Sequence, residues 1–260
     1  MTNMTAYGDT VFNLALLNFK ELEDGISYIL RPTSMRINYG PGEYDIFVGT
    51  GLDYDDEGYP ISGRVTSFTS YEGGSVDFKI TNALSLYATE ISAAAKTASI
   101  SDDQAVFRSL LAGNDVLAGA TRSDVINGYA GNDEITGNGG RDFVTGGAGS
   151  DDFNYRLTSD SKVGAGRDRI TDFRHGTDDI DVSVMDANGS VSGNGTFTFL
   201  SAKGASFTAT RGELRWFQAD AANNASDKTF VEGDINGDAV ADFQIELAGL
   251  VTLSTADFIL

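Results

Sequence analysis

The chain has 260 residues, with 38 acidic and 18 basic side chains, one histidine and no cysteine, so its formal net charge is −20. This composition excludes disulfide bonds, thiolate zinc sites and cysteine nucleophiles, and a single histidine excludes any site that needs two. The charge disfavours nucleic acids and anionic membranes as partners and favours cations. A hydrophobic content of 41% is sufficient for a folded core.

The N-terminal segment is not typical of a secreted protein. Residues Met1–Thr10 contain neither a basic segment nor a long apolar core, so they do not resemble a cleaved signal peptide. No apolar run approaches the ~18 residues of a transmembrane helix. Taken alone, this end of the chain predicts a cytoplasmic protein, whereas the C-terminal half predicts the opposite.

Residues 1–108 are predicted to form an N-terminal β-rich module. Four apolar residues at helical spacing predict a short helix from Thr10 to Glu23. Stretches rich in β-branched and aromatic residues, separated by turn residues, predict strands over 44–52, 63–70 and 75–81. Residues 83–95 are expected to be helical, and a second short helix is expected from the capping residue Ser101 to Leu111.

Residues 109–155 contain a repeat nine residues long. Its unit is Gly-x-x-Gly-x-Asp-x-apolar-x, and each of these residue types recurs every nine positions. The aspartates are Asp115, Asp124, Asp133, Asp142 and Asp151, and the apolar residues are Leu117, Ile126, Ile135, Val144 and Phe153. A fixed period in several residue types indicates stacked structural repeats rather than a flexible loop rich in glycine and aspartate.

We expect each repeat to form a six-residue turn and a three-residue strand, so that two repeats make one coil of a right-handed parallel β-roll. The apolar residues would point inward and form a core one side chain wide. Turns 18 residues apart would stack, which places Asp115, Asp133 and Asp151 on one edge and Asp124 and Asp142 on the other. Stacked carboxylates and carbonyls form an all-oxygen site for a hard cation, and such a flexible site suits Ca²⁺ better than Mg²⁺.

The candidate metal ligands are aspartate carboxylates and backbone carbonyls of the turns. In the repeats they are Gly113, Asp115, Asp124, Gly128, Ala130, Gly131, Asp133, Gly137, Gly139, Gly140, Asp142, Gly146, Ala148, Gly149 and Asp151. One repeat departs from the pattern, because Arg122 stands where the others have glycine. An arginine there predicts backbone strain and a positive charge beside a cation site, and therefore a weaker edge at Asp124 and Asp142.

The repeats and the residues that follow them resemble a known family. The segment from Gly113 to Leu260 is similar to the β-roll and C-terminal region of secreted RTX (repeats-in-toxin) proteins, in particular the serralysin-type (peptidase M10) proteases. The stretches that carry the resemblance beyond the repeats are 166–173, 176–181, 212–216, 231–238 and 257–260. The resemblance implies several bound calcium ions, an uncleaved C-terminal signal, and export by type I secretion machinery to an extracellular location.

Two more aspartates repeat the turn pattern beyond residue 155. Asp168 and Asp178 each stand two residues after a glycine and two before an isoleucine, so they are further candidate calcium ligands. The family's protease domain needs several histidines, whereas the only histidine here, His175, lies in a turn of the tail. Zinc metalloprotease activity is therefore not expected. The predicted fold is mainly β, with the N-terminal module, β-roll repeats over 109–155 and a β C-terminal cap with the secretion signal over 156–260.

The residues leave several functions open. We expect a non-catalytic protein whose N-terminal module binds a surface, a matrix component, a glycan or an extracellular protein, since eight of the ten tyrosines lie in the first 87 residues. The alternative is a secreted hydrolase with its active site in residues 1–108. The acidic run Asp53, Asp55, Asp56 and Glu57 could then supply acid and base, or could simply be a solvated turn. A third possibility is an accessory protein or inhibitor of a co-secreted protease.

The spacing of Asp234, Asn236 and Asp238 is that of the start of an EF-hand loop. Ala239 stands where the sharp bend needs glycine, and Ile245 stands where a bidentate glutamate belongs. A hairpin turn between two strands is therefore the favoured interpretation.

Overall fold

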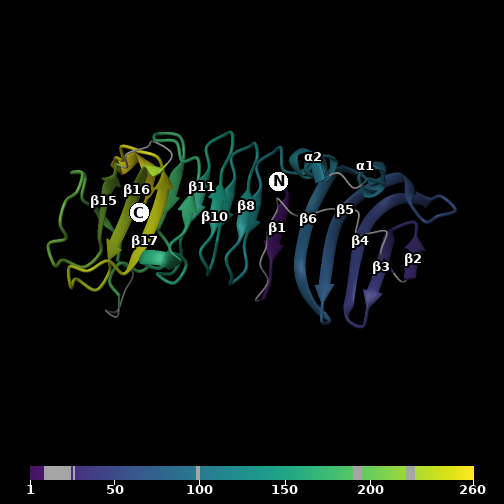
Figure 1. Ribbon diagram of the computed structural model, residues 1–260, viewed down its shortest axis with the longest axis horizontal. Helices are drawn as coiled ribbons and strands as arrows, with labels where there is room; N and C mark the ends of the chain where they lie inside the picture. The colour runs from purple at the N-terminus through teal and green to yellow at the C-terminus, as the bar shows by residue number, and fades with distance from the viewer. Residues whose placement is uncertain (9–24, 26, 98–99, 190–194, 221–225) are drawn as a thin grey trace.

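The computed structural model describes residues 1–8, 25, 27–97, 100–189, 195–220 and 226–260. Its elements follow one another along the long axis of the molecule, from the N-terminal sheet through the roll to the C-terminal strands (Figure 1). The helix predicted over 10–23 lies outside the described residues. No helix in the described part of the chain is long and apolar enough to cross a membrane.

A long antiparallel sheet forms the N-terminal part. Its strands are β1 (Asn3–Ala6), β2 (Ser27–Arg31), β3 (Ser34–Gly40), β4 (Glu43–Tyr54), β5 (Pro60–Glu72) and β6 (Ser75–Tyr87). The strands β2 to β6 are neighbours in chain order, and Gly42 and Gly74 adopt positive φ in two of the tight turns. Buried Met35, Ile37 and Phe47 alternate with more exposed residues, as in a sheet with one face on the core.

Two helices, α1 (Ala88–Ala95) and α2 (Ile100–Leu110), pack against this sheet. The helix predicted over 83–95 was wrong at its start, because β6 continues to Tyr87. Leu86 and Tyr87 pair with Val65 and Arg64 of β5, so sheet pairing prevails over the helix preference of this alanine-rich stretch. The second predicted helix is confirmed as α2.

The first strand connects the N-terminal sheet to the roll. On one side β1 pairs antiparallel with β6, and on the other it pairs parallel with β7 (Val116–Ala118). Val116 N donates to the carbonyl of Thr2 at 2.9 Å. Among the described residues, one sheet of eleven strands therefore runs from β2 to β18. It crosses the boundary expected near residue 108, and the division into three segments stays a prediction.

The repeats form two parallel sheets, as predicted. One contains β7, β9 (Glu134–Thr136), β11 (Asp152–Asn154) and β13 (Asp179–Asp181), and the other contains β8 (Val125–Asn127), β10 (Phe143–Thr145) and β12 (Arg169–Ile170). Leu117 pairs with Ile135 and Ile126 with Val144, so the register is 18 residues. The five apolar repeat residues are at most 3% exposed, which confirms the narrow core.

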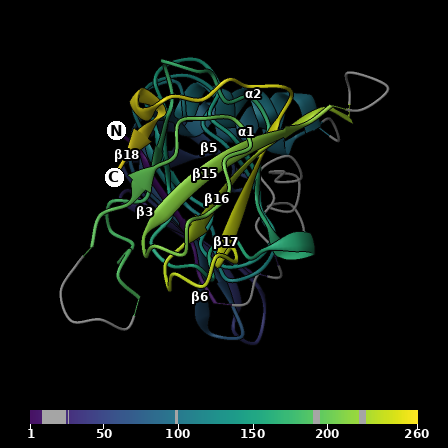
Figure 2. The ribbon, with the colours of Figure 1, turned by 90° about the vertical axis from the view of Figure 1, so that its left-hand side faces the viewer.

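The C-terminal strands continue both sheets at the other end of the roll. β17 (Phe243–Ala248) pairs parallel with β12, and β18 (Phe258–Ile259) pairs parallel with β13. β14 (Thr198–Phe199), β15 (Glu213–Ala219) and β16 (Lys228–Asp234) extend the sheet beyond β17. Seen from this end, β15, β16 and β17 lie in front of the roll (Figure 2). Their side chains Trp216, Phe243 and Ile245 are buried.

The acidic segment between β16 and β17 is a closed turn. Asp234 accepts hydrogen bonds from Gly237 N at 2.7 Å and Ala239 N at 2.8 Å. Asp242 Oδ2 accepts from Ile235 N at 2.8 Å. Because these carboxylate oxygens are used inside the turn, the geometry agrees with the expected hairpin rather than with an EF-hand loop.

Candidate calcium sites

The repeat aspartates form two columns of stacked carboxylates. In each column the Oδ1 atom of one aspartate accepts a hydrogen bond from the backbone N–H of the aspartate 18 residues earlier. The distances are 2.8 Å for Asp133 and Asp115, 3.1 Å for Asp151 and Asp133, and 2.8 Å for Asp142 and Asp124. The stacking register predicted from the nine-residue period is therefore confirmed.

The two tail aspartates extend these columns although their spacing is longer than 18 residues. Asp168 Oδ1 accepts from Asp142 N at 2.8 Å, and Asp178 Oδ1 accepts from Asp151 N at 3.3 Å. We call the first edge the column of Asp115, Asp133, Asp151 and Asp178, and the second edge the column of Asp124, Asp142 and Asp168.

Most of these carboxylates keep one oxygen without a donor. All seven aspartates are at most 2% exposed. Among the described residues, no hydrogen-bond partner reaches the Oδ2 atoms of Asp115, Asp133, Asp142, Asp151 and Asp168. Burying a carboxylate oxygen without a partner is costly unless a cation lies beside it. The pattern therefore indicates a row of cation sites along each edge.

Glycine at the first repeat position borders a hollow beside the carboxylate. A Cβ added at Gly128 would overlap Asp133 Oδ2 and lie 2.6 Å from the carbonyl oxygen of Gly146 in the next turn. A Cβ added at Gly146 would likewise overlap Asp151 Oδ2. In the described chain, no three acidic or histidine side chains converge as a metal-binding group. One carboxylate from each turn, completed by backbone carbonyls, is the oxygen-rich donor set that Ca²⁺ accepts.

The strain predicted at Arg122 was wrong. Gly131 and Gly140 have φ of 136° and 138°, whereas Arg122 is not one of the described non-glycine residues with positive φ. A Cβ at Gly131 would overlap the carbonyl of Gly113, and one at Gly140 would overlap that of Arg122. Each glycine is thus required by the turn that precedes it. Arg122 lies in the first coil, where no repeat turn precedes it, so a side chain is tolerated and gives no reason for a weaker second edge.

Burial raises the pKa values of the column aspartates. The pKa of Asp133 rises from 3.8 to about 7, that of Asp168 to about 8 and that of Asp142 to about 9, with loss of hydration as the main cause. Neighbouring carboxylates of the same column raise them further, as Asp168 does for Asp142. Without a cation, the columns therefore favour protonated carboxyl groups.

The acidic run of the N-terminal module forms a turn between β4 and β5. Asp55 Oδ1 accepts from Tyr59 N at 2.7 Å, and the same side chain pairs with Lys96 at 3.5 Å. The pocket beside this turn is lined mainly by apolar and aromatic residues, with Glu57 as the one carboxylate among them. This geometry favours a charged turn over the paired acid and base of a hydrolase.

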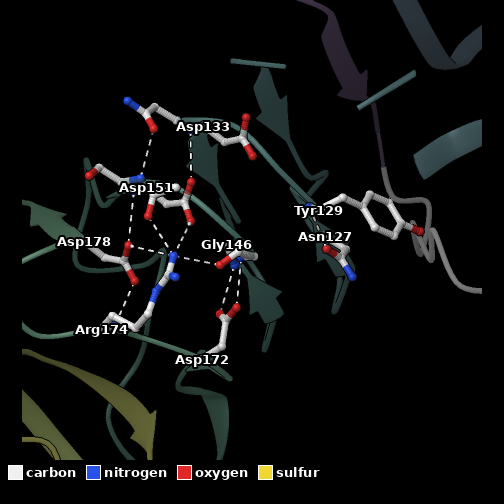
Figure 3. A network of polar contacts seen from close by, with 12 residues as sticks. Asn127, Tyr129, Asp133, Gly146, Asp151, Asp172, Arg174 and Asp178 are labelled. Atoms are coloured by element: carbon white, nitrogen blue, oxygen red, sulfur yellow. Dashed lines mark hydrogen bonds and ion pairs between the residues drawn. The ribbon is translucent and has the colours of Figure 1, made fainter. Parts of the chain in front are cut away.

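Three contacts that complete the columns were not predicted. Thr2 N donates to Asp115 Oδ1, Asp168 N donates to Ser161 Oγ at 2.8 Å, and the Arg174 side chain points toward Asp151 and Asp178 (Figure 3). Thr2 and Ser161 carry no local sequence signal. Arg174 could have been found by aligning its turn with the repeats, because it stands four residues before a column aspartate.

The raised pKa values predict that the metal-free roll becomes less stable as the pH rises. The folded chain binds more protons than the unfolded chain between about pH 4 and pH 9, so the free energy of unfolding falls across this window. We expect more β-structure by circular dichroism in EGTA at pH 5 than at pH 8.5. In calcium the trend should reverse, because calcium competes with protons for the same oxygens. A metal-free roll that gains structure toward pH 8.5 would contradict these pKa values.

Comparison with known proteins places the chain in a family. The family model described as peptidase M10 serralysin C terminal matches residues 67–260. Among solved structures, the AlgE6R3 subunit of the Azotobacter vinelandii mannuronan C5-epimerase is 27% identical, with a TM-score of 0.40, over 57% of this chain and 74% of that chain. The AlgE6R2 subunit of the same enzyme is 24% identical, with a TM-score of 0.30, over 55% of this chain and 90% of that chain. No curated protein matches the chain. Since the family model covers most of its length, the protein belongs to the peptidase M10 serralysin C-terminal family and is a repeat protein of the calcium-binding type.

Proposed function

We propose that this protein is a secreted, non-catalytic repeat protein whose roll folds around several calcium ions. The observation that carries the proposal is the pair of columns of buried carboxylates with unpaired Oδ2 atoms. The proposed carboxylate ligands are Asp115, Asp124, Asp133, Asp142, Asp151 and Asp168. Carbonyls of the glycines and alanines in the same turns complete the coordination. Bound calcium supplies the positive charge that offsets the burial and mutual repulsion of these carboxylates.

Calcium concentration then decides where the chain folds. Extracellular calcium modules bind with Kd of about 10⁻⁴–10⁻³ M, far weaker than cytosolic sites. Inside a cell the sites stay empty, and a core one side chain wide does not offset the chain entropy. We therefore propose that the chain remains unfolded until type I secretion machinery delivers it to the extracellular medium.

The proposed secretion signal lies at the C-terminus, in residues that fold into the roll. Asp257 is fully buried and accepts hydrogen bonds from Ser254 N at 2.6 Å and from Gly176 N at 2.8 Å. Phe258 pairs with Ile180 at the end of the long sheet. These contacts hide the segment in the folded protein, so only an unfolded chain presents it to an exporter.

The N-terminal module is the proposed binding part. Tyr44 and Tyr71 stack across β4 and β5 with ring centroids 4.4 Å apart, and the Arg36 guanidinium lies 3.7 Å from the Tyr44 centroid. By strand alternation, the side of the sheet that carries Tyr44 also carries the exposed Val48 and not the core residue Phe47. A half-exposed aromatic pair beside an arginine supports stacking on a sugar ring.

Removal of calcium is expected to unfold the roll. Far-ultraviolet circular dichroism should show loss of β-structure in EGTA and its recovery at millimolar calcium, because the empty columns repel and are poorly hydrated. Magnesium at the same concentration is the control and should restore little structure. A spectrum that does not change across the calcium titration would exclude calcium-dependent folding.

The same titration on two variants tests the ligands. Asp133 lies between two turns, whereas Asp124 begins its column and its Oδ2 already accepts from Ala120 N at 2.6 Å. Asp133→Asn keeps the acceptor for Asp115 N but removes the charge, and we expect its calcium midpoint to rise on the order of tenfold. Asp124→Asn should shift the midpoint less. The reverse order in isothermal titration would contradict the ligand assignment.

The binding surface predicts a loss of glycan binding in a double variant. On a glycan array, the full calcium-loaded chain should bind a carbohydrate, and Tyr44→Ala with Tyr71→Ala should lose at least most of that signal. Tyr87→Ala is the matched control, because Tyr87 is also exposed and contacts an arginine, but at the other end of β6. Equal binding by all three proteins, or by none, would count against this surface.

The export signal is tested with two fusions. A passenger joined to residues 156–260 should reach the medium of cells that carry a type I exporter, whereas the same passenger joined to residues 1–155 should stay inside. The reason is that only the first fusion contains Asp257, Phe258, Ile259 and Leu260 at its end. Export of the second fusion, or retention of the first, would show that the signal lies elsewhere.

A further inference from the structure

The last gap of the first edge holds a basic side chain. Arg174 Nη2 donates to the carbonyl oxygen of Gly147 at 2.8 Å and to that of Gly149 at 2.7 Å. The same nitrogen lies 4.0 Å from Asp151 Oδ2 and 3.7 Å from Asp178 Oδ1. Figure 3 shows the guanidinium between the two carboxylates. One positive group thus contacts two carbonyls and two carboxylates from successive turns.

The oxygen set around Arg174 is the set that the repeats present one coil earlier. Shifting Gly149 and Asp151 back by 18 residues gives Gly131 and Asp133, and Asp133 Oδ2 is one of the buried oxygens without a partner. The position four residues before the column aspartate is Leu111, Tyr129, Gly147 and Arg174 along the first edge, and Ala120, Asn138 and Gly164 along the second. Of these seven positions, only residue 174 is basic.

The turn that carries Arg174 is fixed by further contacts of its own. Asp172 accepts hydrogen bonds from Gly146 N at 3.0 Å and Gly147 N at 2.8 Å, which join it to the preceding turn. Asp178 Oδ2 accepts from Arg174 N at 2.8 Å, which closes the turn itself. None of these contacts requires a metal ion, so the guanidinium is held in place by the protein alone.

We propose that the Arg174 guanidinium takes the place of a calcium ion in the gap between Asp151 and Asp178. This inference rests on the proposed calcium-binding function of the other gaps. It assigns Asp178 to an ion pair rather than to a calcium site, unlike the expectation from the turn pattern. The last coil of the first edge is then assembled without calcium, whereas the corresponding gap between Asp142 and Asp168 on the second edge depends on it.

Counting bound calcium ions in variants of the full chain tests the proposal. Arg174→Ala removes the guanidinium and leaves the oxygens of a repeat gap, so native mass spectrometry should detect one calcium ion more than in the wild type. Arg141→Ala is the matched control, because this exposed arginine lies over the Phe143 ring at 4.9 Å and contacts no column carboxylate. Its count should equal that of the wild type. In EGTA, Arg174→Ala should melt at a lower temperature than Arg141→Ala.

Asp178→Asn gives a second test that does not depend on the folding of Arg174→Ala. It keeps an oxygen for Asp151 N but removes the charge, and the number of bound ions should stay unchanged if the gap holds arginine. Loss of one ion would overturn the proposal, as would an Arg174→Ala protein with the wild-type ion count and the melting temperature of Arg141→Ala. A wild-type count of zero would refute the calcium-binding function instead, and the comparison in EGTA would still test the arginine.

Discussion

Buried carboxylate oxygens without hydrogen-bond donors are the constraint on which the rest of the structure depends. Each turn carries one such oxygen, and the turns repeat every 18 residues, so the cost accumulates along two lines rather than at one site. The glycines follow from the same constraint, because a Cβ at Gly128 or Gly146 would occupy the space beside the carboxylate. The core cannot compensate, since each three-residue strand contributes a single apolar side chain. A cation is the remaining source of stabilisation.

A roll of this kind also has two open ends, and the chain closes them differently. At the first end, β1 pairs with β7, and Thr2 N donates to Asp115 Oδ1, so the first aspartate of the column receives the donor that a repeat turn would otherwise supply. At the other end, β17 and β18 cover the edges of β12 and β13. Both closures protect sheet edges from pairing with other chains. They also explain why the N-terminal module and the roll share one sheet rather than meeting at a linker.

The period of the repeats was sufficient to predict the part of the structure that is local and repetitive. The 18-residue stacking, the inward apolar residues and the places of Asp168 and Asp178 in the columns all follow from residues a fixed distance apart. The pairing of β1 with β7 joins residues more than one hundred positions apart, and nothing near Asn3 marks it. The strain expected at Arg122 was wrong because a repeat pattern describes an interior turn, whereas Arg122 lies in a terminal one. The extension of β6 to Tyr87 likewise depends on its partner strand and not on its own composition.

The two edges of the roll differ most at their C-terminal ends, and this difference has a consequence for the order of folding. On the first edge, Arg174, Asp172 and Asp257 join the last turns through contacts that the chain makes by itself. On the second edge, Asp142 and Asp168 meet with unpaired oxygens and the highest pKa values of the columns. A coil can therefore begin to form on the first edge before any ion is bound, and it presents ordered carbonyls and carboxylates to the turn before it. Calcium that enters the next gap needs to order only one new turn instead of two, which lowers the entropy lost at each step. In this view the C-terminal segment is the template for the roll, and the repeats are added toward the N-terminus, where β1 closes the sheet.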